Sequence, residues 1–147
     1  MSEQKINIQK MDTLFQTYKP EGFHTVTPYL FVAEPQKLID FLQAAFNAQE
    51  INRSLMPDGA IANVILKIGD TSFMISEARG QFAGMKAALY LYVNDVDVAH
   101  QRAVAQGATV EFEPEDMPYG DRQSGIIDPC GNYWWISKRL EEKDYEE

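Results

Sequence analysis

The feature that most constrains the fold is a pattern of one strand, one helix and three strands that occurs twice along the chain. Val32 and Val93 each end a first strand, and they are 61 positions apart. Ile75 and Ile136, each followed by a serine in a last strand, have the same spacing of 61. One offset shared by several elements indicates an internal duplication. The sequence therefore predicts an α+β fold of two βαβββ modules.

Local signals mark the individual elements. Pro35 stands at a first helical position, and apolar residues follow it at helical spacing as far as Phe46. Asp95 supplies a cap for the second helix, and Gly107 stands where that helix is expected to end. Runs of alternating, β-branched or aromatic residues predict the strands. These are 26–32, 50–56, 62–68 and 73–76 in the first module, and 88–93, 109–112, 123–127 and 133–137 in the second.

The same pattern divides the chain into parts. Residues 1–23 are polar and weakly patterned, and we expect an N-terminal extension there. Residues 24–140 are expected to form the domain proper, with one module at about 24–78 and the other at about 86–140. Residues 141–147 hold five acidic side chains and predict a solvated acidic tail.

The charge balance excludes several classes of partner. Thirteen basic residues stand against 22 acidic ones, for a formal net charge of −9 at pH 7. Such a surface repels phosphate backbones and anionic lipids, so neither nucleic acid nor a membrane is an expected partner, whereas a cationic ligand is favoured. No apolar run approaches the roughly 20 residues that span a bilayer. The single cysteine, Cys130, suits a reducing compartment and predicts a cytoplasmic protein.

Strand alternation places rings and polar groups together on one face. In the first strand of each module the aliphatic side chains share one face, which suits the helix, and the aromatic side chains share the other. Rings with a polar tip suit a small organic ligand, and they equally suit a second interface such as a dimer contact. The residues predicted on this face are Tyr29, Phe31, Asn63, Tyr90, Tyr92 and Trp135.

Short motifs in a characteristic order span about residues 24–140. They are Thr27-Pro28-Tyr29-Leu30-Phe31-Val32, Pro57-Asp58-Gly59, Ile68-Gly69-Asp70, Leu89-Tyr90-Leu91-Tyr92-Val93-Asn94-Asp95-Val96, Gly107-Ala108-Thr109-Val110, Tyr119-Gly120-Asp121-Arg122 and Asp128-Pro129-Cys130-Gly131-Asn132-Tyr133-Trp134. Together they resemble the vicinal oxygen chelate superfamily of glyoxalases, bleomycin resistance proteins and extradiol dioxygenases, and most of all its phosphonate-operon-associated, glyoxalase-like branch. The resemblance implies paired modules, a curved mixed sheet with a cavity, and a homodimer.

The resemblance also implies where a metal would bind. In metal-using members, His and Glu side chains on the strands hold a divalent ion. Aligned residue by residue, those ligand positions fall at Thr27, Ala88 and Trp135. None of these side chains replaces imidazole or carboxylate as a ligand, and Asn63 lies near only one further polar position. We therefore expect no metal ligand, no catalytic residue and no cofactor.

The predicted function is that of a metal-free small-molecule binding protein whose partner is a cationic or aromatic organic molecule. Two alternatives stay open. One is a metal-dependent lyase or isomerase with a displaced ion, held through His24 or Asn63. The other is a structural or regulatory dimer without a ligand. The predicted ligand-binding residues are Tyr29, Phe31, Asn63, Tyr90, Tyr92, Arg122 and Trp135.

Four further features have simpler explanations. Arg122 is a candidate for the ligand site, but a structural ion pair or an anchor of its loop is the favoured interpretation. Cys130 is expected to fill a turn, because no histidine is near it in the sequence. His100 is predicted on the exposed side of the second helix. The acidic residues between 111 and 116 are predicted in a solvated loop that runs over 113–120.

Overall fold

This computed structural model describes residues 13–145 of the chain. They contain two four-stranded sheets, one for each predicted module. The first part of the predicted extension, 1–12, and the last two residues of the tail lie outside the described residues. The strand orders are β1-β4-β3-β2 and β5-β8-β7-β6. The elements are β1 (Tyr29–Val32), α2 (Pro35–Phe46), β2 (Gln49–Leu55), β3 (Ile61–Ile68), β4 (Thr71–Glu77), the 3₁₀ turn η1 (Gly80–Phe82), β5 (Ala88–Tyr92), α3 (Val96–Ala105), β6 (Thr109–Asp116), β7 (Asp121–Ile127) and β8 (Tyr133–Arg139).

The duplication holds at the level of strand register. Strand β1 runs parallel to β4 with Tyr29 opposite Met74, and β5 runs parallel to β8 with Tyr90 opposite Trp135. Each residue of the second pair therefore stands 61 positions after its counterpart in the first pair. The other pairs in each sheet are antiparallel. The predicted α+β fold of two βαβββ modules is confirmed.

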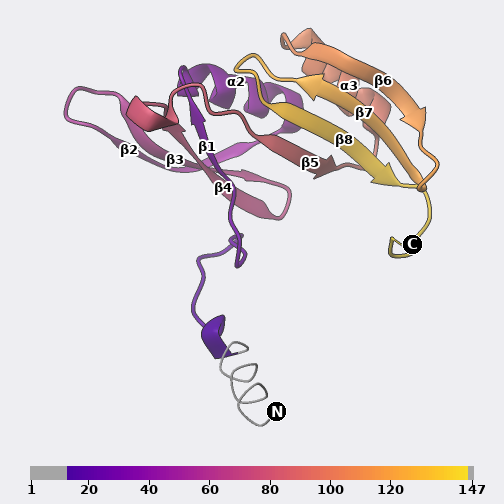
Figure 1. The fold of residues 1–147 in the computed structure, drawn as a ribbon, viewed down its shortest axis with the longest axis horizontal. Coiled ribbons are helices and arrows are strands. Elements are labelled where there is room, and N and C mark those ends of the chain that lie inside the picture. The colour runs from indigo at the N-terminus through magenta and orange to yellow at the C-terminus, as the bar shows by residue number, and fades with distance from the viewer. Residues whose placement is uncertain (1–12, 146–147) are drawn as a thin grey trace.

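The two helices join the modules on one side of the sheets. Both lie behind the sheets in Figure 1, and the guanidinium of Arg102 on α3 donates to the carbonyl of Ala44 on α2 (3.1 Å). Helix α2 begins with Pro35 and ends at Asn47, which adopts the left-handed conformation (φ 57°) that asparagine tolerates. Helix α3 is capped by Asp95, whose carboxylate accepts from the amide of Val98 (3.1 Å).

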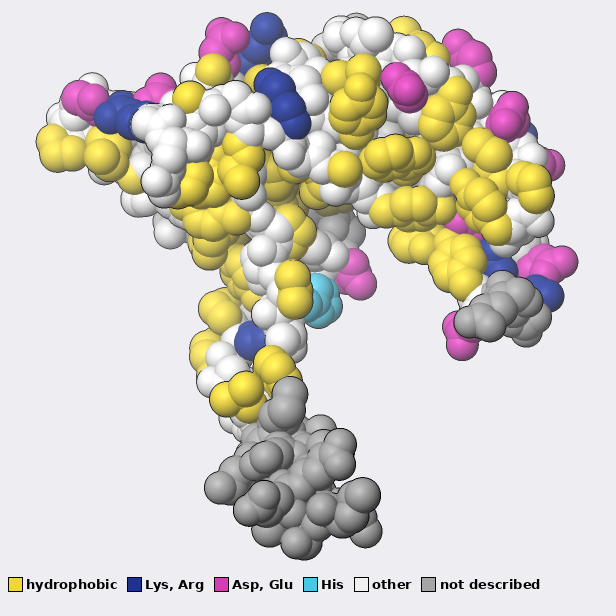
Figure 2. Space-filling view, in the orientation of Figure 1, with side chains coloured by type: hydrophobic (Ala, Val, Ile, Leu, Met, Phe, Trp, Pro, Cys, Tyr) yellow, Lys and Arg dark blue, Asp and Glu magenta, His cyan; other side chains and the backbone are white. Residues whose placement is uncertain are grey.

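The predicted division of each sheet into an aliphatic and an aromatic face is borne out by burial. Leu30 and Val32 on β1, and Ile75 and Ile136 on the last strands, are at most 4% exposed and pack under the helices. On the opposite face the rings remain accessible. Hydrophobic side chains spread over both sheets on the face seen in Figure 2, and the surface below them is hollowed. The helix side therefore holds the core and leaves the other face free.

The acidic segment after Thr109 differs from its prediction. Strand β6 continues to Asp116, where a loop over 113–120 was expected, and β7 begins at Asp121, two residues earlier than predicted. The pairing of β6 with β7 is irregular between Phe112 and Glu115, around Pro114. Because proline lacks an amide donor, an irregular stretch of an edge strand is where it is tolerated. The sequence pattern did not predict this strand, because its charged and turn-forming residues are typical of a loop.

No helix within residues 13–145 combines the length and the apolar character that crossing a membrane would require.

Candidate ligand-binding site

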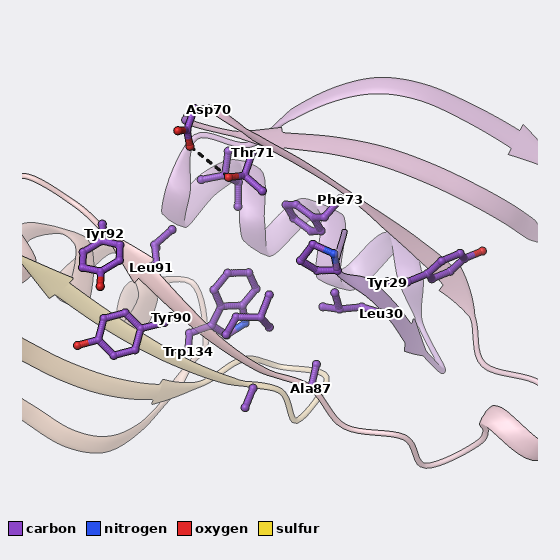
Figure 3. A pocket seen from close by; sticks show the side chains of 15 residues that line it. Tyr29, Leu30, Asp70, Thr71, Phe73, Ala87, Tyr90, Leu91, Tyr92 and Trp134 are labelled. Carbon is purple, nitrogen blue, oxygen red and sulfur yellow. Dashed lines mark hydrogen bonds between the residues drawn. The ribbon is translucent and has the colours of Figure 1, made fainter. Parts of the chain in front are cut away.

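A cleft of about 570 Å³ separates the edge strand β1 of the first sheet from the edge strand β5 of the second. Leu30, Phe73 and Trp134, each 2% exposed, lie at its base. Tyr90 and Tyr92 form one wall, and Figure 3 shows Tyr29 on the far side with its phenol pointing away from them. Of the predicted ligand-binding residues, Tyr29, Tyr90 and Tyr92 line this cleft, whereas Phe31, Asn63 and Trp135 do not. The predicted rings lie in two groups, one on each module.

The first group is a stack of rings on the open face of the first module. Tyr29 stacks on Phe31 with ring centroids 4.6 Å apart, and Phe31 stacks on Phe82 of η1 at 4.4 Å. The Tyr29 hydroxyl lies 2.6 Å from Ser76 Oγ and accepts from the amide of Asn63 (3.1 Å). These contacts bring together the predicted residues Tyr29, Phe31 and Asn63. Phe82 was missed, because its segment has no periodic pattern.

The second group lies on the open face of the second module. Tyr90 and Tyr92 have ring centroids 5.2 Å apart, and Trp135, opposite Tyr90 in the sheet, stacks on Tyr133 at 6.1 Å. The Tyr90 hydroxyl donates to the carboxylate of Asp121 (2.6 Å). The predicted residues Tyr90, Tyr92 and Trp135 thus share a surface with a carboxylate that sequence reasoning did not place there.

Asp121 is a fully buried carboxylate that belongs to an ion pair. Its Oδ1 accepts from Arg139 Nη1 (2.9 Å), directly across the β7–β8 pairing, and its Oδ2 accepts from Tyr90 and Tyr145 (2.6 Å each). Burial by itself raises the pKa of Asp121, but the hydrogen bonds from Tyr145 and Tyr90 and the guanidinium of Arg139 outweigh it and lower that pKa overall. Burial and the hydrogen bond to Asp121 raise the pKa of Tyr90. Asp121 is therefore a charged acceptor, and the tyrosine beside it is a neutral donor.

The C-terminal tail makes a contact that the sequence did not indicate. Residues 141–145 are exposed, in line with the predicted solvated end, but the hydroxyl of Tyr145 donates to Asp121 and lies 2.7 Å from the hydroxyl of Tyr92. Its ring also lies 4.2 Å from the guanidinium carbon of Arg139. Contacts over so many positions in the chain leave no local signal. The tail therefore covers part of the aromatic face of the second module.

Two polar residues do not lie where the sequence placed them: Arg122 lies away from the predicted ligand site, and His100 is buried. Arg122 points to the helix side of β7, where its guanidinium pairs with Asp97 on α3 (2.8 Å) and Asp116 on β6 (3.0 Å), so the structure does not bring it to the rings. His100 was predicted to be exposed and is 4% exposed. Its Nδ1 lies 2.9 Å from Ser124 Oγ, and its Nε2 lies 3.2 Å from Glu113 without hydrogen-bond geometry.

Cys130 lies in the turn between β7 and β8, as predicted, and is half-buried. Burial, together with the charge of Asp128, raises the pKa of its thiol. A reactive cysteine needs the opposite shift, because the thiolate is the nucleophile. This environment favours a structural role in the turn.

The positions where the resemblance places a metal do not fit one. Thr27 uses its hydroxyl to donate to the carbonyl of His24 (3.1 Å), and Ala88 and Trp135 offer no ligand atom that binds metals well. Across residues 13–145, no group of three His, Cys, Asp or Glu side chains converges.

Comparison with known proteins places this architecture. The chain is 31% identical to an uncharacterized protein of Mycobacterium tuberculosis, over 95% of this chain and 86% of that protein. The crystal structure of TnmS3, an antibiotic binding protein from Streptomyces sp. CB03234, superposes with a TM-score of 0.63 at 22% identity, covering 79% of this chain and 95% of that one. The crystal structure of lactoylglutathione lyase from Agrobacterium tumefaciens superposes with a TM-score of 0.61 at 19% identity, covering 85% of this chain and 100% of that one. The sequence profile of one superfamily matches residues 22–136. The chain belongs to the Glyoxalase/Bleomycin resistance protein/Dioxygenase superfamily.

Proposed function

We propose that this protein binds a small organic molecule on the aromatic surfaces beside the β1–β5 cleft, without a bound metal. The observation that carries the proposal is the exposure of the rings there: Tyr29, Tyr90 and Tyr92 are 43%, 45% and 58% exposed. Tyrosine combines a large apolar ring with a hydrogen-bonding tip, and such rings beside a cleft of about 570 Å³ suit a small ligand. Arg122 is left out of this site, because its ion pairs hold it on the helix side.

The superfamily and the overall charge support the same class of ligand. A neighbouring fold belongs to a protein described as antibiotic binding. The net charge of −9 attracts cations, and cations are also attracted to aromatic faces. A cationic aromatic compound is therefore the first ligand to test.

Three finer assignments complete the proposal. The chain is a homodimer, in which a second copy covers part of the exposed rings so that the ligand lies near the subunit boundary. It belongs to the phosphonate-operon-associated branch of the superfamily, which its short motifs between about residues 24 and 140 resemble. It acts in the cytoplasm, where its single cysteine stays reduced.

The test is a titration of the full-length protein with aromatic compounds, in which the tryptophan fluorescence of the protein reports binding. Proflavine represents cationic rings, and a panel of neutral and anionic polycyclic compounds completes the set. We expect saturable binding of proflavine, weakened about tenfold by Tyr92→Ala through loss of ring contact. Tyr18→Ala is the matched control, because Tyr18 is 87% exposed on the segment that projects from the sheets (Figure 1). The absence of saturable binding across the whole panel would refute the proposal.

The superfamily also contains enzymes, and one neighbouring fold is a lactoylglutathione lyase. An enzymatic role with a displaced metal predicts a stoichiometric ion in protein purified without chelators. Elemental analysis by mass spectrometry measures this directly. A stoichiometric transition metal would favour the enzyme over the metal-free binding protein.

A further inference from the structure

The last described residues of the chain turn back over the second module. After β8, the amide of Leu140 donates to the carbonyl of Gly120 (2.8 Å), and Arg139 Nε donates to the carbonyl of Lys143 (3.0 Å). Figure 1 shows the end of the chain forming a short hook at the end of β8. This hook delivers one aromatic side chain, Tyr145, to the open face of the sheet.

Tyr145 is held there as a ligand would be. Its hydroxyl donates to Asp121 Oδ2 (2.6 Å) and lies 2.7 Å from the hydroxyl of Tyr92. The guanidinium of Arg139 lies 4.2 Å from the ring centroid, within the range of a cation–π contact. Tyr145 is nevertheless 51% exposed, so no surrounding shell of protein locks it in place. The polar tip is bound and the ring remains open to exchange.

The receiving groups lie on the sheet and not on the tail. Asp121 is bonded to Arg139 across the strand pair and to Tyr90, and it is 0% exposed with the tail in place. Tyr90 and Tyr92 also line the β1–β5 cleft, so this place is continuous with the proposed ligand surface. A buried carboxylate that accepts, beside a guanidinium that faces a ring, suits a neutral ring carrying a hydroxyl donor. It disfavours an anionic group at the carboxylate and a cationic ring under the guanidinium.

We propose that Asp121, Arg139, Tyr90 and Tyr92 form a binding site for phenols, and that Tyr145 is a tethered occupant which a phenolic ligand displaces. This rests on the proposed function and deepens it by naming the ligand class of one part of the surface. Burial and the bond to Asp121 raise the pKa of Tyr145, in accord with a neutral phenol in that place. A tether supplies its own end at high effective concentration, so the site is closed in most molecules until a ligand competes.

The test compares 2-naphthol with 2-methoxynaphthalene, which has the same rings and no hydroxyl donor, by isothermal titration calorimetry on full-length variants. Tyr145→Ala should bind 2-naphthol at least about tenfold more tightly than the wild type, because apparent affinity scales with the fraction of open sites. Glu142→Ala, in the same tail, is the matched control and should change nothing. Tyr145→Phe keeps the ring without the donor and should give an intermediate gain.

Each outcome has a defined meaning. A gain limited to 2-naphthol, and lost when Asp121→Asn is added to Tyr145→Ala, supports the phenol site. Equal affinity of 2-naphthol for the wild type and Tyr145→Ala overturns it, as does an equal gain for both compounds. If proflavine binds saturably while the affinity for 2-naphthol is the same with and without Tyr145, the phenol site is refuted and the proposed function stands. If no aromatic compound binds any variant, both fail.

Discussion

The two modules share a polar framework on their open faces, but only the second adds a buried charge. In the first, Tyr29, Ser76 and Asn63 form a hydrogen-bonded set of neutral groups. In the second, Tyr90 and Ser137 stand 61 positions later, and the amide of Gln123 donates to Ser137 (2.8 Å). The duplicated fold has therefore kept a tyrosine, a serine and a side-chain amide on corresponding strands.

The difference arises at the far end of one strand pair. Val64 pairs with Ile75 and Ser124 with Ile136, which aligns β3 with β7 and sets Ile61 against Asp121. Position 78, an alanine, corresponds in the same way to Arg139. An isoleucine and an alanine in the first module thus stand at the positions of an ion pair in the second. In the second module Tyr90 bonds to this carboxylate, and the tail docks there.

The largest effect should follow from breaking the ion pair that distinguishes the modules. Asp121→Asn removes the buried negative charge that pairs with the guanidinium of Arg139 and should lower the free energy of unfolding by about 3 kcal/mol. The corresponding change in the first module, Ile61→Val, removes one methyl group at a partly exposed position and should cost less than about 1 kcal/mol. Urea unfolding at fixed protein concentration measures both.

The pH dependence of the same variant tests whether the charge matters. The folded protein lowers the pKa of Asp121 from its ordinary 3.8, so the carboxylate stabilises the fold above that value and loses its contribution as pH falls below it. The stability difference between the wild type and Asp121→Asn should therefore shrink below pH 3.8. A difference that stays constant with pH would show that shape, and not ionisation, is responsible.

Sequence patterns could predict the fold and most of the rings for a physical reason. A strand repeats every two residues, so the face of Tyr29 or Tyr90 follows from its neighbours alone. The same logic failed for Asp121, because turn-forming residues before it concealed the start of β7. His100 was placed at the surface from its polarity, yet the offset of 61 aligns it with the fully buried Ile39. That alignment was the available signal.

Other features had no local signal. Tyr145 contacts Asp121 and Tyr92, which are 24 and 53 positions away. Such tertiary contacts depend on the direction in which the tail leaves β8, and the local residue pattern does not predict that direction. The acidic composition of the tail predicted a solvated segment, and its described residues are exposed. Composition gave no indication that the hydroxyl of Tyr145 would bond to the sheet.

The turns between the last two strands of each module should differ next most strongly. Asp128 is 3% exposed and accepts from the amides of Cys130 (2.8 Å) and Asn132 (3.1 Å) and from the indole of Trp134 (2.8 Å). Asp128→Ala leaves these donors unpaired and should cost about 2 kcal/mol. Asp70, in the corresponding turn, is exposed, and Asp70→Ala should change stability by less than about 0.5 kcal/mol. Equal effects in thermal and urea unfolding would contradict this.

The smallest expected difference separates the two tyrosines of the shared framework. Tyr90→Phe removes a donor to an ionised carboxylate, and Tyr29→Phe removes one that faces a neutral serine. Hydrogen bonds to charged groups contribute more, but both rings are nearly half exposed, so we expect losses of about 1 and about 0.5 kcal/mol. Paired urea titrations resolve this difference. A larger loss for Tyr29→Phe would mean that the neutral set holds its sheet more tightly than the charged one, which would reverse the contrast between the modules.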